Sequence, residues 1–158
     1  GYKNKMQAPK IVKVMVTSGI GKVTDKKRKE AIAKRLTEIV GQKVQVTKAK
    51  KSIAGFKLRE GEDVGLVATL RGPRLFAFLE KLVHIALPRT RDFRGISNKG
   101  FDEMGNYTFG IKEHTIFPEA AEEDVRDTFG LGITVVTTAK TKKESEALMR
   151  LIGLPIIK

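Results

Sequence analysis

Five cations lie within the twelve consecutive residues from Lys48 to Arg59, around one serine and one phenylalanine. Lysine and arginine side chains neutralise phosphates, and an aromatic ring can stack on an unpaired base. No acidic residue interrupts this run before Glu60. The pattern predicts a basic loop near residues 48–59 that grips a nucleic-acid backbone. A charged loop that simply faces solvent is the alternative interpretation.

A second cationic segment carries three arginines, Arg89, Arg91 and Arg94, and has no regular hydrophobic period. Asp92 could orient one guanidinium through a bidentate ion pair and so present the segment to a nucleic acid. In a purely structural interpretation, Asp92 and Arg94 pin the segment to the domain, and both interpretations can hold together. We expect residues 89–105 to form a long ordered or binding loop.

The other chemically versatile residues do not form a catalytic or metal-binding set. Gly19 to Lys22 is similar to part of a phosphate-binding loop, but Val23 stands where that motif needs serine or threonine. His84 and His114 are 30 residues apart and lack partners at ligand spacing. Salt bridges are the expected state of the carboxylates Asp92, Asp102, Glu103 and Glu113. The chain has no cysteine, which excludes thiolate metal sites and cysteine nucleophiles. Because no nucleophile, base and orienting group can be assembled, we expect no enzyme, no metal and no cofactor.

The charge balance indicates a polyanionic partner. Lysine and arginine number 31 against 18 aspartates and glutamates, which gives a net charge of +13 over 158 residues. Nucleic acid is the first candidate, and a membrane is a distant second because no apolar run approaches the ~20 residues of a spanning helix. The length fits one domain, and the lack of cysteine is compatible with a reduced compartment. We expect a single RNA-binding domain over residues 1–158.

Hydrophobic periodicity predicts an α+β fold. Strands are expected where apolar and polar residues alternate, at Ile11 to Thr17, Val44 to Thr47, Val64 to Arg71, Tyr107 to Ile111 and Ile133 to Ala139. Helices are expected at Asp25 to Val40, Pro73 to Leu87 and Thr141 to Ile152. These elements predict a mostly antiparallel sheet of about five strands with helices packed on one face.

The same periods assign side chains to the two faces of the sheet. The first strand should bury Val12, Val14 and Val16 and turn Thr17 to the other face, which Thr69 and Arg71 share. Hydroxyls on that face would contact sugar and phosphate. A short strand or hairpin arm is expected at Phe56 to Arg59. The second helix should bury Ile85 within its apolar stripe, and the last helix should bury Leu148, Leu151 and Ile152.

Long motifs in one order give a more specific indication. They are Gly41-Gln42-Lys43, Thr47 to Arg59, Thr69 to Gly72, Leu87 to Gly95, Gly105-Asn106-Tyr107, Gly110 to Glu113 and Ile116 to Glu119. Together they closely resemble the bacterial form of large-subunit ribosomal protein five, in register from about Tyr2 to Lys158.

The resemblance implies a structural protein of the large ribosomal subunit in the cytoplasm, with an organellar ribosome as the alternative location. It implies an α+β domain that binds 5S ribosomal RNA in the central protuberance and also touches 23S ribosomal RNA. The loop that matches Ala49 to Asp63 would reach the peptidyl-site tRNA. Further partners would be neighbouring large-subunit proteins and a small-subunit head protein across the subunit interface.

The 5S-contacting positions of the family correspond to Thr17, Gln42, Phe56 and Thr69, and the family normally has asparagine where Thr17 stands. The full set expected to bind 5S RNA is Thr17, Ser18, Gly19, Gln42, Lys43, Thr47, Lys48, Phe56, Thr69 and Arg71. The tRNA-binding loop would use Lys50, Lys51, Ser52, Lys57 and Arg59. Contacts to other RNA or to the subunit bridge would come from Arg89, Arg91, Arg94 and Lys99. The rival functions are an RNA-modifying or RNA-cleaving enzyme and a free RNA chaperone or regulator.

Overall fold

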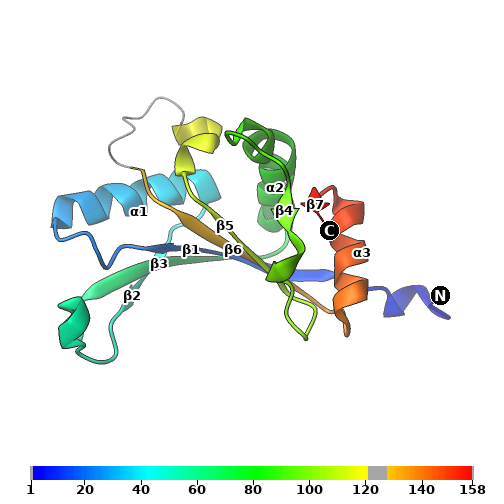
Figure 1. Ribbon diagram of the computed structural model, residues 1–158, viewed down its shortest axis with the longest axis horizontal. Coiled ribbons are helices and arrows are strands. Elements are labelled where there is room, and N and C mark those ends of the chain that lie inside the picture. Colours follow the sequence, from blue (N-terminus) through cyan, green and yellow to red (C-terminus); the bar gives the residue numbers. More distant parts are fainter. Residues whose placement is uncertain (1, 121–127, 158) are drawn as a thin grey trace.

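The computed structural model describes residues 2–120 and 128–157. In this part of the chain, five strands form one antiparallel sheet in the order β2-β3-β1-β6-β5. They are β1 (Ile11–Gly19), β2 (Gln45–Lys48), β3 (Asp63–Leu70), β5 (Tyr107–Ile111) and β6 (Leu131–Thr137). The α-helices are α1 (Lys26–Val40), α2 (Pro73–Lys81) and α3 (Lys142–Ile152). Figure 1 shows α1 and α2 on the same side of the sheet, which confirms the predicted α+β class.

Local signals in the sequence set the bounds of α1. The Asp25 side chain accepts a hydrogen bond from the Lys27 backbone N–H and caps the first turn. Gly41 ends the helix in the left-handed region with φ 71°, where a side chain would be strained. The helix buries the predicted stripe, which is Ile32, Leu36, Ile39 and Val40. This face covers the sheet and leaves the basic residues of the helix outside.

The core side of the sheet follows the predicted alternation except at Val12 on β1 and Val46 on β2, which is 43% exposed. Val14 and Val16 are completely buried on β1, but Val12 is 45% exposed and the prediction for it was wrong. The pairing of β1 with β6 shifts in register between Ile11 and Lys13. Such a bulge places an extra residue in one strand and turns its side chain away from the regular pattern.

The predicted second helix changes its number of residues per turn before it ends. After α2 the chain makes a wider turn of π type over Leu82–Ala86 and then a 3-10 turn over Leu87–Arg89. The wider turn adds a residue and rotates the following side chains. Ile85 is therefore 44% exposed, and its predicted burial was wrong.

The last helix, α3, begins as predicted but turns a different face to the core. The Thr141 hydroxyl accepts from the Glu144 N–H and caps the helix. Ser145 and Met149 are fully buried, Leu148 and Ile152 are half-buried, and Leu151 is 86% exposed. The predicted burial of Leu151 was wrong because α3 packs on the core through the face that contains Ser145 and Met149, and Leu151 lies on another face.

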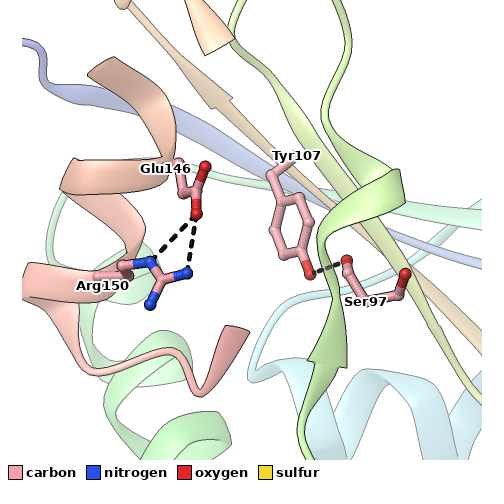
Figure 2. Close-up of polar contacts among 4 residues, drawn as sticks. All are labelled: Ser97, Tyr107, Glu146 and Arg150. Atoms are coloured by element: carbon pink, nitrogen blue, oxygen red, sulfur yellow. Dashed lines mark hydrogen bonds and ion pairs between the residues drawn. The ribbon is translucent and has the colours of Figure 1, made fainter. Parts of the chain in front are cut away.

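Residues 89–105 form an ordered segment that contains short elements of its own. β4 (Ile96–Ser97) pairs in parallel with β7 (Ile156–Ile157), near the C-terminal end of the described chain. The Tyr107 hydroxyl donates a hydrogen bond of 2.9 Å to the Ser97 carbonyl oxygen (Figure 2). Burial raises the pKa of Tyr107 to about 12, so the phenol keeps its proton at neutral pH. Pairing far along the chain therefore holds a segment whose own sequence has no period.

Figure 2 also shows an ion pair within α3, in which the Arg150 guanidinium contacts Glu146 Oε1 at 2.8 Å. Both side chains are accessible to water, so we expect a contribution of at most about 1 kcal/mol. This ion pair lies within one helix and stabilises α3 alone.

Candidate nucleic-acid interface

The sheet face opposite α1 and α2 is open, and hydroxyls and glycines dominate its centre. We call it the open face; its central residues are Met15, Thr17, Gly65, Val67, Thr69, Thr108, Gly110, Gly132 and Thr134. These residues are half-buried or exposed, whereas their neighbours along each strand are mostly buried. Residues that pair directly across strands share a face, so this surface is continuous from β3 to β5.

Two predicted contact residues that are far apart in the sequence meet at one edge of the open face. Gln42 follows the end of α1, and its Nε2 atom donates a hydrogen bond of 3.1 Å to the Thr69 carbonyl oxygen on β3. Lys43 and Arg71 are neighbours of these two residues in the sequence, and both are exposed. The fold therefore gathers an amide, a hydroxyl and cations, as binding of an RNA backbone requires.

The three predicted residues at the end of β1 do not share one environment. Thr17 is half-buried on the open face, and Gly19 is exposed. Ser18 points to the core side, is 4% exposed, and donates a hydrogen bond of 2.9 Å to the Gly130 carbonyl oxygen. Because β-strand side chains alternate, Ser18 cannot share the face of Thr17. The Ser18 hydroxyl therefore stabilises the fold and is not available to a ligand on the open face.

The segment 48–63, which joins β2 to β3, forms a projecting arm that we call the finger; it lies at the opposite end of the molecule from α3 (Figure 1). Its base is closed by hydrogen bonds from Ala49 N–H to the Glu62 oxygen and from Gly61 N–H to the Ala49 oxygen, 2.8 and 3.0 Å. At its tip a 3-10 turn, Ala54–Phe56, is bracketed by an Ile53–Leu58 bridge. The expected strand at Phe56 to Arg59 was therefore wrong, although the hairpin-arm alternative agrees with this closure.

The finger presents cations and one ring to the outside. Its exposed basic side chains are Lys48, Lys50, Lys51, Lys57 and Arg59. Within the described residues, none of the five forms an ion pair. Phe56 is 75% exposed at the tip. Ser52 is exposed as well, but its Oγ accepts a hydrogen bond of 3.0 Å from the Glu60 N–H and so helps to shape the finger.

The arginine segment lies elsewhere on the molecule. Arg89, Arg91, Arg94 and Lys99 are exposed, and Asp92 takes a left-handed conformation with φ 50°. Within the described chain, no ion pair joins Asp92 to an arginine. The segment leads into β5, whereas the finger follows β2, and β5 and β2 are the two opposite edges of the sheet. One compact site cannot hold both sets of cations.

Several residues of the open face were not predicted. Thr108 on β5 and Thr134 on β6 are paired in register, and their hydroxyl oxygens are 3.0 Å apart. Gly132 lies beside Thr17 in the same way. The sequence does contain a pattern that indicates them, because polar and small residues alternate with buried apolar ones along β5 and β6. Without the pairing order, however, those positions could not be assigned to the same face as Thr17.

His114 is completely buried and supports the fold near the end of β1. Its ring stacks on Phe129 with centroids 3.9 Å apart, and its Nδ1 accepts a hydrogen bond of 3.3 Å from the Phe129 N–H. Burial, with a smaller effect from the positive charge of Arg35, lowers the pKa of His114. Within the described residues, no group of three or more potential ligands could hold a metal ion.

The lowered pKa of His114 predicts a loss of stability in acid. Above the unfolded-state pKa of about 6.5, the His114 ring is neutral in both the folded and the unfolded state, so its titration does not change the free energy of unfolding. As the pH falls below that value, the unfolded state binds a proton more readily than the folded state does, which favours unfolding. We expect the free energy of unfolding to decrease from about pH 6.5 downward. In His114→Asn, which keeps an acceptor but does not titrate, urea titrations across this range should show a weaker decrease. In the matched control His84→Asn, at a less buried position, the decrease should persist; an unaltered profile in His114→Asn would contradict the prediction.

Residues 4–59 match the family model described as ribosomal protein L5, and residues 63–156 match the model for the C-terminus of the same ribosomal family. The chain belongs to the ribosomal protein L5 family. The resemblance stated from the motifs is thereby confirmed.

Curated bacterial relatives in this family cover nearly the whole chain. The large ribosomal subunit protein uL5 of Ureaplasma urealyticum is 54% identical over an alignment of 158 positions that covers 99% of this chain and 86% of the relative. The protein of the same name from Desulfotalea psychrophila is 54% identical over 100% of this chain and 89% of its own length. That of Geobacter sulfurreducens is 49% identical over 98% and 87%.

Membership of the L5 family makes this chain a structural, non-enzymatic constituent of the large ribosomal subunit, which associates with ribosomal RNA and other components of the subunit. The bacterial relatives belong to the cytoplasmic ribosome, the predicted location. In the described part of the chain, no helix is long and apolar enough to cross a membrane.

Proposed function

We propose that this L5-family protein binds 5S ribosomal RNA on its open face, with further contacts to 23S ribosomal RNA. The observation that carries the proposal is the meeting of Gln42 and Thr69, 27 residues apart in the chain, through the bond of 3.1 Å from Gln42 Nε2. Thr17 is on the same face, and Lys43, Lys48 and Arg71 add charge near its edge. Thr47, Phe56 and Gly19 remain in the proposed contact set, while the buried Ser18 hydroxyl does not.

The other cations of the finger, beyond Lys48 at its base, have a separate proposed partner, the tRNA in the peptidyl site. Lys50, Lys51, Lys57 and Arg59 lie beyond the edge of the sheet on an arm closed by its own hydrogen bonds. Such a projection can reach a ligand without the open face moving. The exposed Arg89, Arg91, Arg94 and Lys99, near the other edge, are proposed to contact further RNA or a small-subunit head protein.

Removal of single polar groups should weaken 5S RNA binding without unfolding the protein. We expect Gln42→Ala and Thr69→Ala each to cost about 1 kcal/mol of binding free energy, the size of one hydrogen bond. Filter-binding titration against 5S RNA measures the loss, and thermal unfolding reports on the fold. Gln7→Ala, an exposed glutamine in the first 3-10 turn, is the matched control and should bind normally. Unchanged affinity in both test variants would remove these residues from the site.

The proposed partners can also be tested in the cell. In fractionated extract, the protein should sediment with the large subunit and 5S RNA should be recovered with it on affinity capture. In strains that carry the Gln42→Ala and Thr69→Ala pair, the ratio of 5S to 23S RNA in large subunits should fall. A protein that sediments free of subunits would support a chaperone or regulatory role instead.

A further inference from the structure

Between Thr17 and the β5 edge, the positions of the open face that pair with Thr17 are glycines. Thr17 pairs with Gly132 on β6, and Gly132 pairs in turn with Gly110 on β5. On the other side, Gly19 pairs with Gly65, next to the Thr47 pairing. With no Cβ at these positions, a polynucleotide could approach the strands closely. Thr17 would then be a polar side chain at the border of the glycine-lined part of the open face.

The Thr17 hydroxyl is already committed as a donor. Its Oγ1 donates a hydrogen bond of 3.3 Å to the Gly132 carbonyl oxygen. The absence of a side chain at Gly132 permits this geometry, because a Cβ there would lie 2.7 Å from Thr17 Oγ1. A hydroxyl has one proton and two acceptor lone pairs. With that proton directed at Gly132, Thr17 offers a ligand only an acceptor.

Gln42 is oriented by the same kind of contact. One N–H of the Gln42 amide donates to the Thr69 carbonyl oxygen. The opposite orientation of the amide would place Gln42 Oε1 against that carbonyl oxygen, and two acceptors repel each other. Its Oε1 is thereby directed away from Thr69 as an acceptor. The Thr108–Thr134 pair differs, since one hydroxyl donates to the other across 3.0 Å and the second proton stays available. Gln42 also keeps its second N–H as a donor, so of these two residues only Thr17 is restricted to accepting a hydrogen bond.

An acceptor selects a particular part of an RNA backbone. Phosphate and ring oxygens of the backbone only accept hydrogen bonds, whereas the ribose 2′-hydroxyl can donate. We propose that Thr17, positioned by Gly132, accepts a hydrogen bond from a ribose 2′-hydroxyl of the bound RNA and so discriminates RNA from DNA at this point. This inference rests on the proposed binding of 5S RNA to the open face. A base amino group is the other possible donor, and the test separates the two.

Analogue-interference mapping tests the contact. Pools of 5S RNA that carry one 2′-deoxy substitution per molecule are selected for binding to the wild-type protein, Thr17→Ser, Thr17→Val and Gly132→Ala. We expect a nucleotide at which the deoxy substitution weakens wild-type and Thr17→Ser binding about fivefold, the effect of one hydrogen bond. In Thr17→Val this interference should vanish. Gly132→Ala should behave in the same way, because its methyl displaces the Thr17 hydroxyl.

Thr24→Val is the matched control, since it removes an exposed hydroxyl outside the open face and should leave the Thr17-dependent interference in place. A deoxy pattern that is the same in Thr17→Val and wild type would overturn the inference. So would interference that depends on Thr17 but arises only when an amino group is removed from a base, and not on 2′-deoxy substitution. Failure of the wild-type protein to bind unmodified 5S RNA would instead refute the proposed function itself.

Discussion

Reversal of charge at Lys50 and Lys51 should weaken peptidyl-site tRNA retention by about tenfold in reconstituted ribosomes, on the scale of two lost phosphate contacts. Both lysines are exposed on the finger and, within the described residues, neither forms an ion pair. Their replacement by glutamate therefore removes attraction to phosphate without breaking an internal contact. Filter binding of tRNA to ribosomes that carry the Lys50→Glu and Lys51→Glu protein measures the effect.

The same variant should bind 5S RNA nearly as well as the wild type, because Lys50 and Lys51 lie outside the proposed 5S contact set. Lys142→Glu with Lys143→Glu, an exposed pair at the start of α3, controls for the change in net charge and should retain tRNA normally. Neutral Lys50→Gln with Lys51→Gln should reduce the slope of log affinity against log salt for tRNA by about two. An equal loss of 5S affinity would contradict the proposed division of labour.

Replacement of Gly100 by alanine should lower the free energy of unfolding by about 3 kcal/mol, at the upper end of the cost of overpacking. A Cβ at Gly100 would lie 2.1 Å from the Thr108 carbonyl oxygen and 3.0 Å from the Tyr107 ring. Backbone cannot move aside as a flexible side chain can, so the 89–105 segment or β5 must shift. Urea-induced unfolding measures the loss.

Gly110→Ala is the matched control for this prediction. Its added Cβ would meet only the Leu131 carbonyl oxygen, at an ordinary 3.9 Å, so stability should be unchanged or slightly raised. Because the segment carries Lys99 and Arg94, Gly100→Ala should also impair any contact that depends on these cations. A stability equal to that of Gly110→Ala would show that the approach to Thr108 is not rigid.

Much of the fold followed from local patterns. The period of 3.6 and the caps at Asp25 and Gly41 specify α1, and alternation specifies the strands. The errors at Val12, Ile85 and Leu151 have a common cause. A bulge, a wider helical turn and a choice between two apolar stripes all depend on what the element packs against, which no local period records.

The candidate site shows the same division. The sequence by itself determined the polyanion preference, the basic finger and the family, since these depend on composition and on motifs in order. Only the tertiary structure decided that Ser18 donates to the Gly130 carbonyl oxygen, that Gln42 donates to that of Thr69, and that Thr17 donates to that of Gly132. Those facts depend on strand order and register, which bring together residues from distant parts of the chain. Whether a hydroxyl donates or accepts is determined by such neighbours.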